Sequence, residues 1–206
     1  IVLIIGMPTA LYIVQSETTS FKMALELCLD LLAATPSIIF GLFGFAFFAR
    51  SLGLGYSILS GSLSLSIMIL PFIIRIFVDI LKESHLTYWN SAKTIGLSSY
   101  VYTFKILLPN KLPSLVSALI LAWTKAMSET AVLLFTAGYA TRWIESPLDS
   151  GRSLGVHIYE LSMNISGGEQ MANQSAFVLL SVTMIFIFIA RIFLWSFKPW
   201  HKQIMH

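Results

Sequence analysis

Two pairs of oppositely charged residues interrupt otherwise apolar segments of the sequence. Lys125 and Glu129 lie in a segment from about 112 to 138, and Arg75 and Asp79 lie near the end of another apolar segment. Each pair has the i,i+4 spacing that places two residues on one face of a helix, where opposite charges partly neutralise one another. Charges inside a membrane are costly, so such residues commonly line a pathway or pair with one another.

The depth of the two cations bears on their roles. Lys125 comes 13 residues after Leu112, about 20 Å along a helix, which would be near the middle of a membrane. We expect Lys125 and Glu129 to line a path for a solute, with a purely structural ion pair as the alternative. Arg75 lies about 7–8 Å from the expected end of its span, so it either faces the path with Asp79 or extends to the interface. These four residues, Arg75, Asp79, Lys125 and Glu129, therefore form a candidate pathway for a charged solute, and a cation beside a carboxylate could bind an anion weakly enough to release it.

No catalytic or metal-binding constellation is evident from spacing. The four histidines are scattered and lack the spacing of metal ligands. The sequence contains no G-x-x-x-x-G-K-[ST] loop for binding a nucleotide. We therefore expect no catalytic residue, no metal site and no cofactor in this chain.

The composition points to a membrane protein. Only 11% of the 206 residues are charged and 56% are hydrophobic, whereas soluble domains have about 25% charged residues. These values exclude an ordinary cytosolic enzyme and a disordered chain, and the single cysteine, Cys28, excludes a disulfide-stapled module. Because a lone strand cannot satisfy its backbone in lipid, we expect an all-α integral membrane protein.

Apolar segments of membrane-spanning length recur along the chain. A span needs about 20 residues, and uncharged runs of about that length or more cover 31–49, 51–74 and 170–190. The chain opens at Ile1 inside an apolar run, so we expect an upstream part to be missing. The prediction is a transmembrane domain over 1–198 and a short tail over 199–206, with five spans at about 1–14 (partial), 27–49, 56–80, 112–138 and 174–197.

Small residues within these spans predict close helix contacts. Ser57, Gly61 and Ser64 would form a stripe on one helix, and the glycines of the segment 41–44 would do the same on another. Small side chains let helix backbones approach one another in a membrane.

The distribution of Lys and Arg between the polar segments predicts the orientation. Cytoplasmic loops carry an excess of these residues, so we place 82–111 and the C-terminus in the cytoplasm and 139–173 outside. Trp143, Trp195 and Trp200 would lie near membrane interfaces. The side holding 82–111 has Lys22, Lys82, Lys93, Lys105, Lys111, Lys198 and Lys202, and the other side has Arg50, Arg142 and Arg152.

The segment 82–111 has the pattern of two short amphipathic helices around a glycine. Gly96 stands where a helix C-terminal glycine belongs, Ser98 or Ser99 can cap the next helix, and Pro109 is expected to end it. Such a hairpin either lies on the lipid headgroups or docks a cytoplasmic partner. The expected apolar faces are Tyr88, Ala92 and Ile95 on the first helix, and Leu97, Val101, Phe104 and Leu108 on the second.

This segment resembles the EAA motif of ABC importer permeases, E-A-A-x3-G-x9-I-x-L-P, in the run NSAKTIGLSSYVYTFKILLP. Asn90 stands where the family has Glu, and Ser91 stands where it often has Ala. The matching positions are Ala92, Gly96, Ile106, Leu108 and Pro109. The resemblance implies a loop that couples to a groove of an ATPase through Asn90, Ser91, Ala92, Lys93, Gly96 and Pro109, with Lys93 able to pair across that interface.

Further segments are similar, in the same order, to phosphate ABC importer permeases of the PstA type. The resemblance implies the five-helix, MetI-like permease core, in which the basic residues matching Arg75 and Lys125, with the acids beside them, line the translocation path. Lys125 stands where an Arg is usual, and Ser128 where a Gly is usual. The similar segments are ATPSIIFGLFGFAFF (34–48), ILPFIIRIFVDILK (69–82), SETAVLLFTAG (128–138) and SLGVHIYELS (153–162).

The resemblance implies a non-enzymatic permease subunit that imports inorganic phosphate across a bacterial inner membrane by alternating access. ATP and Mg would be bound by a partner ATPase dimer. The other implied partners are a second permease subunit of the PstC type, a periplasmic phosphate-binding protein and membrane lipid, with no nucleic acid. One alternative is a similar importer for another oxyanion, such as molybdate or sulfate. The other is an ion-coupled carrier or channel that uses Lys125 and Glu129 as a charge relay.

Overall fold

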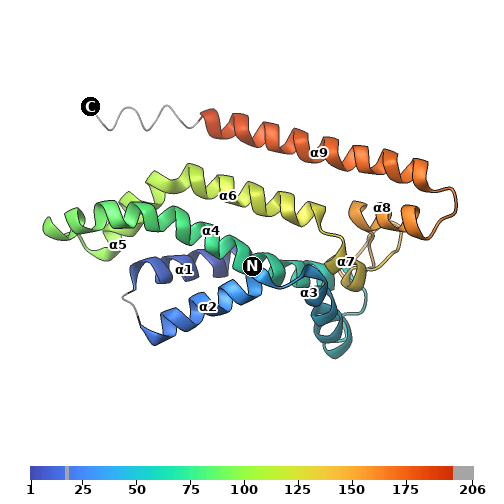
Figure 1. Cartoon of the computed structure of the whole chain (residues 1–206), viewed down its shortest axis with the longest axis horizontal. Coiled ribbons are helices and arrows are strands. Elements are labelled where there is room, and N and C mark those ends of the chain that lie inside the picture. The colour runs from blue at the N-terminus through green and yellow to red at the C-terminus, as the bar shows by residue number, and fades with distance from the viewer. Residues whose placement is uncertain (17–18, 197–206) are drawn as a thin grey trace. The chain divides into compact units, whose positions relative to one another are not determined.

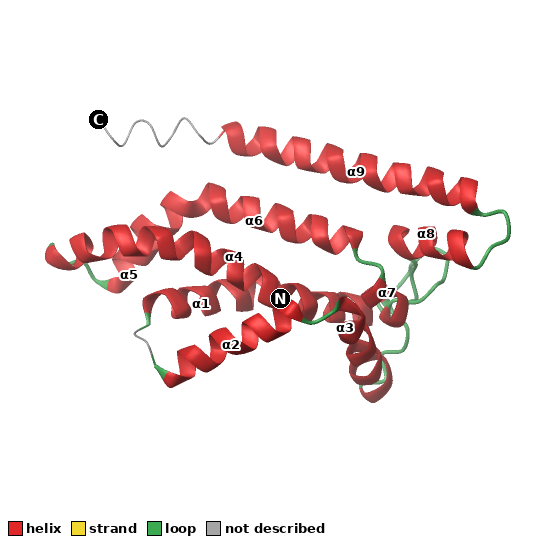
Figure 2. Ribbon diagram, viewed as in Figure 1, coloured by secondary structure: helices red, strands yellow, loops and turns green. Residues whose placement is uncertain are grey.

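The computed structural model describes residues 1–16 and 19–196, with side chains up to residue 194. Every regular element in these ranges is a helix, which confirms the predicted all-α class (Figure 2). The expected tail at 199–206 lies outside the described residues, as do Lys198, Trp200 and the side chain of Trp195. Figure 1 labels α-helices in chain order. The elements are α1 (Val2–Gln15), α2 (Ser20–Ala34), α3 (Ser37–Gly44), the π-helical η1 (Phe45–Ser51), α4 (Ile58–Thr94), α5 (Ser99–Val101), the π-helical η2 (Tyr102–Leu107), α6 (Leu108–Ser128), α7 (Ala131–Thr136), α8 (Leu154–Met163) and α9 (Glu169–Ser196).

Three helices in the described part of the chain are long and apolar enough to cross a membrane. They are α4, the continuous helix Ser99–Ser128 built from α5, η2 and α6, and the Glu169–Leu194 part of α9. A fourth crossing results if α2 and the α3–η1 helix count as one broken span, and α1 is shorter. The five predicted spans fall on these helices, although their number stays a prediction.

Two of the predicted spans are broken rather than continuous. The expected span 27–49 is interrupted at Thr35 and Pro36, because a residue before proline is disfavoured in the helical conformation. Pro36 instead precedes α3 with φ −57° and ψ 138°. The expected span 112–138 is interrupted at Glu129 and Thr130, between α6 and α7.

Pro109 does not end the second helix of the predicted hairpin. It is the second residue of α6, and the helix continues from it to Ser128. The π-helical turns of η2 directly precede it. Local π-helical adjustments accommodate the hydrogen bond that proline cannot donate.

The first helix of that hairpin is not a separate short helix either. It is the last part of α4, whose 37 residues run without interruption from Ile58 to Thr94. At about 1.5 Å per residue the helix is about 55 Å long, whereas the hydrocarbon core of a membrane is about 30 Å thick. The turns of α4 after the predicted span 56–80 therefore extend beyond that core.

The chain divides into two compact units. Unit 1 contains Ile1–Ala33, Leu70–Ala122 and the described part of Phe188–His206, and unit 2 contains Ala34–Ile69 and Trp123–Ile187. In unit 1, α1 packs against α4: a β-carbon added to Gly6 would lie 3.5 Å from Ile73. Phe77 and Leu81 of α4 are fully buried in this core.

Unit 2 is held by small residues at helix contacts, as the sequence predicts. A β-carbon at Gly44 of α3 would overlap the side chain of Ser64 on α4. A β-carbon at Gly61 of α4 would lie 2.9 Å from that of Ala137, which follows α7. Contacts this close leave no room for a side chain, so the glycines are required by packing.

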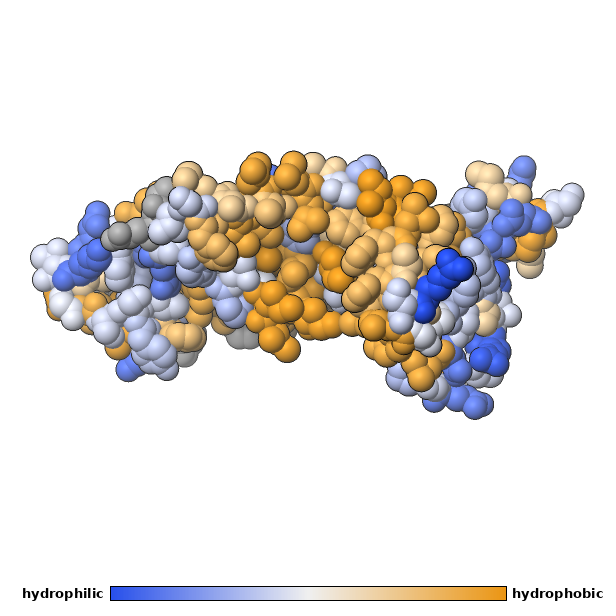
Figure 3. Space-filling view, turned by 90° about the horizontal axis from the view of Figure 1, so that it is seen from below, coloured by the Kyte–Doolittle hydropathy of each residue, from blue (hydrophilic) through white to orange (hydrophobic). Residues whose placement is uncertain are grey.

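Much of the outer surface is apolar. Hydrophobic residues cover a large part of the face seen in Figure 3. On α9, Phe177, Met184 and Phe188 are each more than half exposed. Exposed apolar helix faces of this extent suit contact with lipid or with another membrane helix.

We expect Gly44→Val to lower the free energy of unfolding by about 1–3 kcal/mol, the usual cost of forcing extra atoms into a packed site. The cause is the overlap with Ser64. Thermal unfolding in detergent measures the effect. The matched control is Ala46→Val, which adds the same two γ-carbons at an exposed position of η1. Equal melting temperatures for the two variants would contradict the prediction.

Candidate functional site

The turn after α4 is closed by two backbone hydrogen bonds around a glycine. The N–H of Leu97 donates to the carbonyl of Ala92, and the N–H of Gly96 donates to that of Lys93, each over 3.0 Å. Gly96 has a φ of 74°, a left-handed conformation that glycine adopts without steric cost. This is a Schellman motif, which satisfies the last carbonyls of a helix. The predicted helix C-terminus at Gly96 is therefore confirmed.

A serine begins the next helix, and its neighbour joins the hairpin to α1. The hydroxyl of Ser98 accepts a hydrogen bond from the N–H of Val101 over 3.3 Å and caps α5. Ser99, the other candidate cap, donates instead to Oε1 of Gln15 over 3.3 Å. Nε2 of Gln15 donates to Oγ1 of Thr103 over 2.7 Å. The end of α1 is thus tied to the second half of the hairpin.

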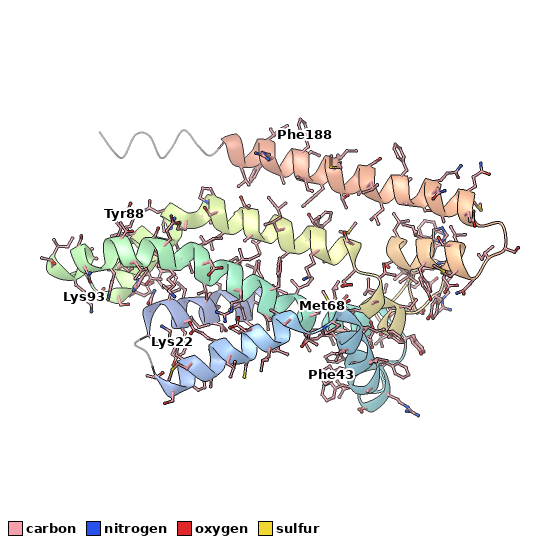
Figure 4. The ribbon with its side chains drawn as sticks, viewed as in Figure 1. Lys22, Phe43, Met68, Tyr88, Lys93 and Phe188 are labelled. Carbon is pink, nitrogen blue, oxygen red and sulfur yellow. The ribbon has the colours of Figure 1, made fainter. Side chains whose placement is uncertain are left out.

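Five of the six predicted coupling residues are exposed. Ala92 is the exception, at 5% exposed, so the motif's alanine packs inside unit 1. Lys93 lies near the end of α4 (Figure 4). Its ammonium is 5.0 Å from the centre of the Trp89 ring, a cation–π contact. The exposed residues are Asn90, Ser91, Lys93, Gly96 and Pro109.

The buried face of the hairpin differs from the predicted one. Phe104 is 52% exposed, whereas Tyr102, Thr103 and Leu107 are buried. The prediction assumed the α-helical period, but this part of the chain is the π-helical η2, in which hydrogen bonds join residues five apart. Tyr102 and Leu107 have that spacing. On the first helix only Ala92 of the predicted face is buried, and Tyr88 and Ile95 are exposed.

An aromatic cluster that the sequence analysis missed lies at the base of the hairpin. The ring centres of His85 and Trp89 are 5.2 Å apart, and that of Trp89 is 5.0 Å from that of Tyr102. The i,i+4 spacing of His85 and Trp89 was the only available sequence signal. Lys111 forms an ion pair with Glu83 over 2.9 Å, which also joins the start of α6 to α4.

Arg75 contacts α2 and not its predicted partner. Its Nη2 forms an ion pair with Oδ1 of Asp30 and donates to the carbonyl of Glu26 over 2.9 Å. Asp79 is exposed. The predicted pairing of Arg75 with Asp79 is therefore wrong, because α2 supplies a carboxylate where the i,i+4 argument considered α4 alone.

Lys125 and Glu129 lie at the end of α6, within unit 2. Lys125 is exposed on the last turn, and Glu129 is half-buried just after the helix, so the two are not on one continuous helix as predicted. A β-carbon at Gly155 of α8 would lie 3.5 Å from the carbonyl of Glu129. The start of α8 therefore packs against the break. Arg75 and Asp79 belong to unit 1.

The predicted outer loop carries an ordered aspartate. The carboxylate of Asp149 accepts hydrogen bonds from the N–H groups of Glu145 and Ser146, each over 2.9 Å, and pairs with Arg142 over 3.3 Å. The two backbone hydrogen bonds, and then Arg142, lower the pKa of Asp149 below its usual range. Asp149 therefore remains ionised at neutral pH and organises the loop.

These helices make the chain an integral membrane protein, and sequence comparison identifies its family. Residues 3–200 match the family described as binding-protein-dependent transport system inner membrane component. The chain belongs to this family. Membership confirms that the chain is a membrane transport component and not an enzyme.

Several bacterial relatives are similar along most of the chain. A probable ABC transporter permease protein, YqgI of Bacillus subtilis, is 30% identical, and the alignment covers 90% of this chain and 67% of the relative. A phosphate transport system permease protein PstA homolog of Mycoplasma pneumoniae is 33% identical over 88% of this chain and 29% of its own length. The phosphate transport system permease protein PstA 2 of Mycobacterium bovis is 27% identical, and the alignment covers 93% of this chain and 65% of the relative. The chain thus spans two thirds or less of the length of most of these relatives.

A solved structure shares the fold. The MetNI methionine ABC transporter, in an inward-facing conformation, contains a chain that matches with a TM-score of 0.73. The match covers 95% of this chain and 87% of that chain at 16% identity. The predicted MetI-like fold is therefore confirmed.

We expect Gly96→Ala to destabilise the hairpin turn locally by about 1–2 kcal/mol, because an L-residue is strained in the left-handed conformation. No atom lies within 4 Å of the added β-carbon, so the effect is conformational alone. Amide hydrogen exchange of residues 92–103 should become faster. Gly167→Ala is the matched control, since Gly167 has a φ of 76° and equally open surroundings. Unchanged exchange in Gly96→Ala would refute the assignment of the turn.

Proposed function

We propose that this chain is the permease subunit of an ATP-driven importer whose cargo is inorganic phosphate. The observation that carries the proposal is the hairpin at 82–111, in which Asn90, Ser91, Lys93 and Gly96 of an EAA-like motif are exposed at a turn closed at Gly96. An exposed turn closed by backbone hydrogen bonds, at the end of the 37-residue helix α4, is suited to receive a mechanical input from a cytoplasmic partner. In this proposal the partner is a separate ATPase dimer, which binds ATP and Mg.

The choice of phosphate is supported by relatives and by charge. Relatives from Mycoplasma and Mycobacterium are named as PstA phosphate permeases or homologs. Arg75 is a cation with a fork of N–H groups that suits a phosphate oxyanion. Lys125 supplies only a point charge, which does not distinguish phosphate from other oxyanions, so an importer of molybdate or sulfate is the second candidate.

The proposed importer also needs further partners and a defined orientation in the membrane. The importer would contain a second permease subunit of the PstC type and receive its cargo from a periplasmic phosphate-binding protein. It would lie in a bacterial inner membrane with 82–111 and the C-terminus in the cytoplasm, as the Lys and Arg distribution predicts. Arg75, Asp79, Lys125 and Glu129 would line the path, and closure of the ATPase dimer would switch its access between the two sides.

We expect Lys125→Gln to lower ATP-dependent uptake of labelled phosphate about tenfold or more, equivalent to about 1.4 kcal/mol, because the path loses a cation. Lys125→Arg should retain uptake. Arg50→Gln is the matched control, since it removes an exposed cation at the end of η1. The measurement uses the complete importer in proteoliposomes, with and without ATP.

Competing anions and ATP dependence decide between the candidate functions. Uptake that only phosphate analogues compete supports phosphate as the cargo. Uptake competed by molybdate or sulfate keeps the importer and changes the cargo. Uptake that is indifferent to ATP and follows the membrane potential would overturn the importer and favour the ion-coupled carrier.

We expect Asn90→Cys to cross-link to a cysteine placed in the groove of the ATPase, in a background where the exposed Cys28 is replaced by Ser. Asn90 is exposed on the last turns of α4. Ala92→Cys is the matched control and should not cross-link, because Ala92 is buried. Absence of the Asn90 cross-link in an assembled complex would count against docking at this hairpin.

A further inference from the structure

Arg75 is held by α2 through two acceptors of different charge. Its Nη2 forms an ion pair with the carboxylate of Asp30. The same nitrogen donates a hydrogen bond of 2.9 Å to the backbone carbonyl of Glu26. Glu26 and Asp30 are one helical turn apart, which is why one nitrogen reaches both. The acidic residue on Arg75's own helix, Asp79, is not the partner.

We propose that Asp30 is the counter-ion that an incoming oxyanion displaces from Arg75, an assignment that rests on the proposed function in anion import. Asp30 thereby sets how tightly the path holds its cargo. The carbonyl of Glu26 is neutral and does not compete with an anion, so it keeps the guanidinium in place during the exchange. Asp30 is charged and competes directly.

The exposure of the pair allows such an exchange. The side chain of Arg75 is 26% exposed and that of Asp30 is 61% exposed within this chain. A fully enclosed ion pair resists the removal of one partner, because an uncompensated buried charge remains. A partly exposed pair contributes little net stability, so another anion can replace the carboxylate at small cost.

The guanidinium also keeps donor capacity for the incoming anion. Arginine carries five N–H donors, and the two contacts with α2 both use Nη2. Nε of Arg75 is buried and has no hydrogen-bond partner among the described residues. An oxyanion that takes the place of Asp30 on Nη2 can therefore gain a second hydrogen bond from Nε, which the carboxylate does not make.

The competition predicts opposite effects on binding and release. Without the carboxylate, the anion no longer displaces a charge, so it binds more tightly and leaves more slowly. Asp30→Asn should lower KM about two- to fivefold, the size expected from a partly exposed ion pair, and lower kcat as well. A carboxylate that only joins α2 to α4 would change stability and leave KM unaltered.

The test measures initial rates of labelled phosphate uptake at a series of phosphate concentrations, with the complete importer in proteoliposomes. ATP is supplied on the side of the membrane that the ATPase dimer faces. Glu26→Gln is the matched control, because it removes a carboxylate from the same helix and keeps the carbonyl that contacts Arg75. Asp30→Glu should retain nearly parental values. Asp30→Ser is a second neutral variant, and the same fall in KM is expected from it.

A fall in both KM and kcat for the neutral Asp30 variants, with parental values for the controls, supports the proposal. An unchanged KM overturns it, whether or not the melting temperature falls. Failure of both neutral variants to assemble assigns Asp30 a structural role and also overturns it. A parental importer that transports none of the oxyanions refutes the proposed function itself. That outcome is distinct from an active parent whose Asp30→Asn variant has the parental KM and kcat, which overturns only the role of Asp30.

Discussion

Hydrogen bonds at both ends of helix α4 satisfy its terminal backbone groups and so fix where the helix begins and ends. Helices α1, α2, α3 and α6 all contact α4, so their positions depend on it. At its start, three N–H groups donate to carbonyls of the segment 136–149, and at its end the Schellman motif at Gly96 satisfies two carbonyls. An unsatisfied backbone group in or beside lipid costs several kcal/mol, so such closure decides where a membrane helix can stop. The N–H groups at the start are those of Ser57, Ile58 and Leu59, and their acceptors are the carbonyls of Thr136, Asp149 and Pro147.

Close backbone contact supplies the packing that hydrophobicity alone does not provide between membrane helices. Lipid tails are as apolar as the side chains, so helices gain stability from shape and from small residues at their crossings. Gly44 and Gly61 show this in unit 2, where neighbouring side chains occupy the space that a β-carbon would need. Unit 1 adds polar contacts to its apolar core: Gln15 bonds to Thr103, and Arg75 contacts α2. The hairpin is thereby joined to α1, while Arg75 stays near the surface of its unit.

In the proposed importer, the placement of charge links these contacts to anion transport. A cation that remains available to an anion cannot be buried in a permanent pair, and it cannot be left without a partner in an apolar setting. The half-exposed contact between Arg75 and Asp30 lies between these extremes. Lys125 and Glu129 lie where α6 gives way to irregular backbone.

The sequence by itself determined the all-helical membrane class, the turn at Gly96 and the close contacts at Gly44 and Gly61, because composition, helix-ending signals and small-residue spacing are local properties. The EAA-like spacing also identified the hairpin. Only the tertiary structure decided the partner of Arg75, since Asp30 is far from it in sequence and on another helix. It also decided the buried face of η2, where π-helical hydrogen bonding changes the spacing that a 3.6-residue period assumes. Local periodicity describes one helix at a time, whereas ion pairs and packed faces depend on which helices meet.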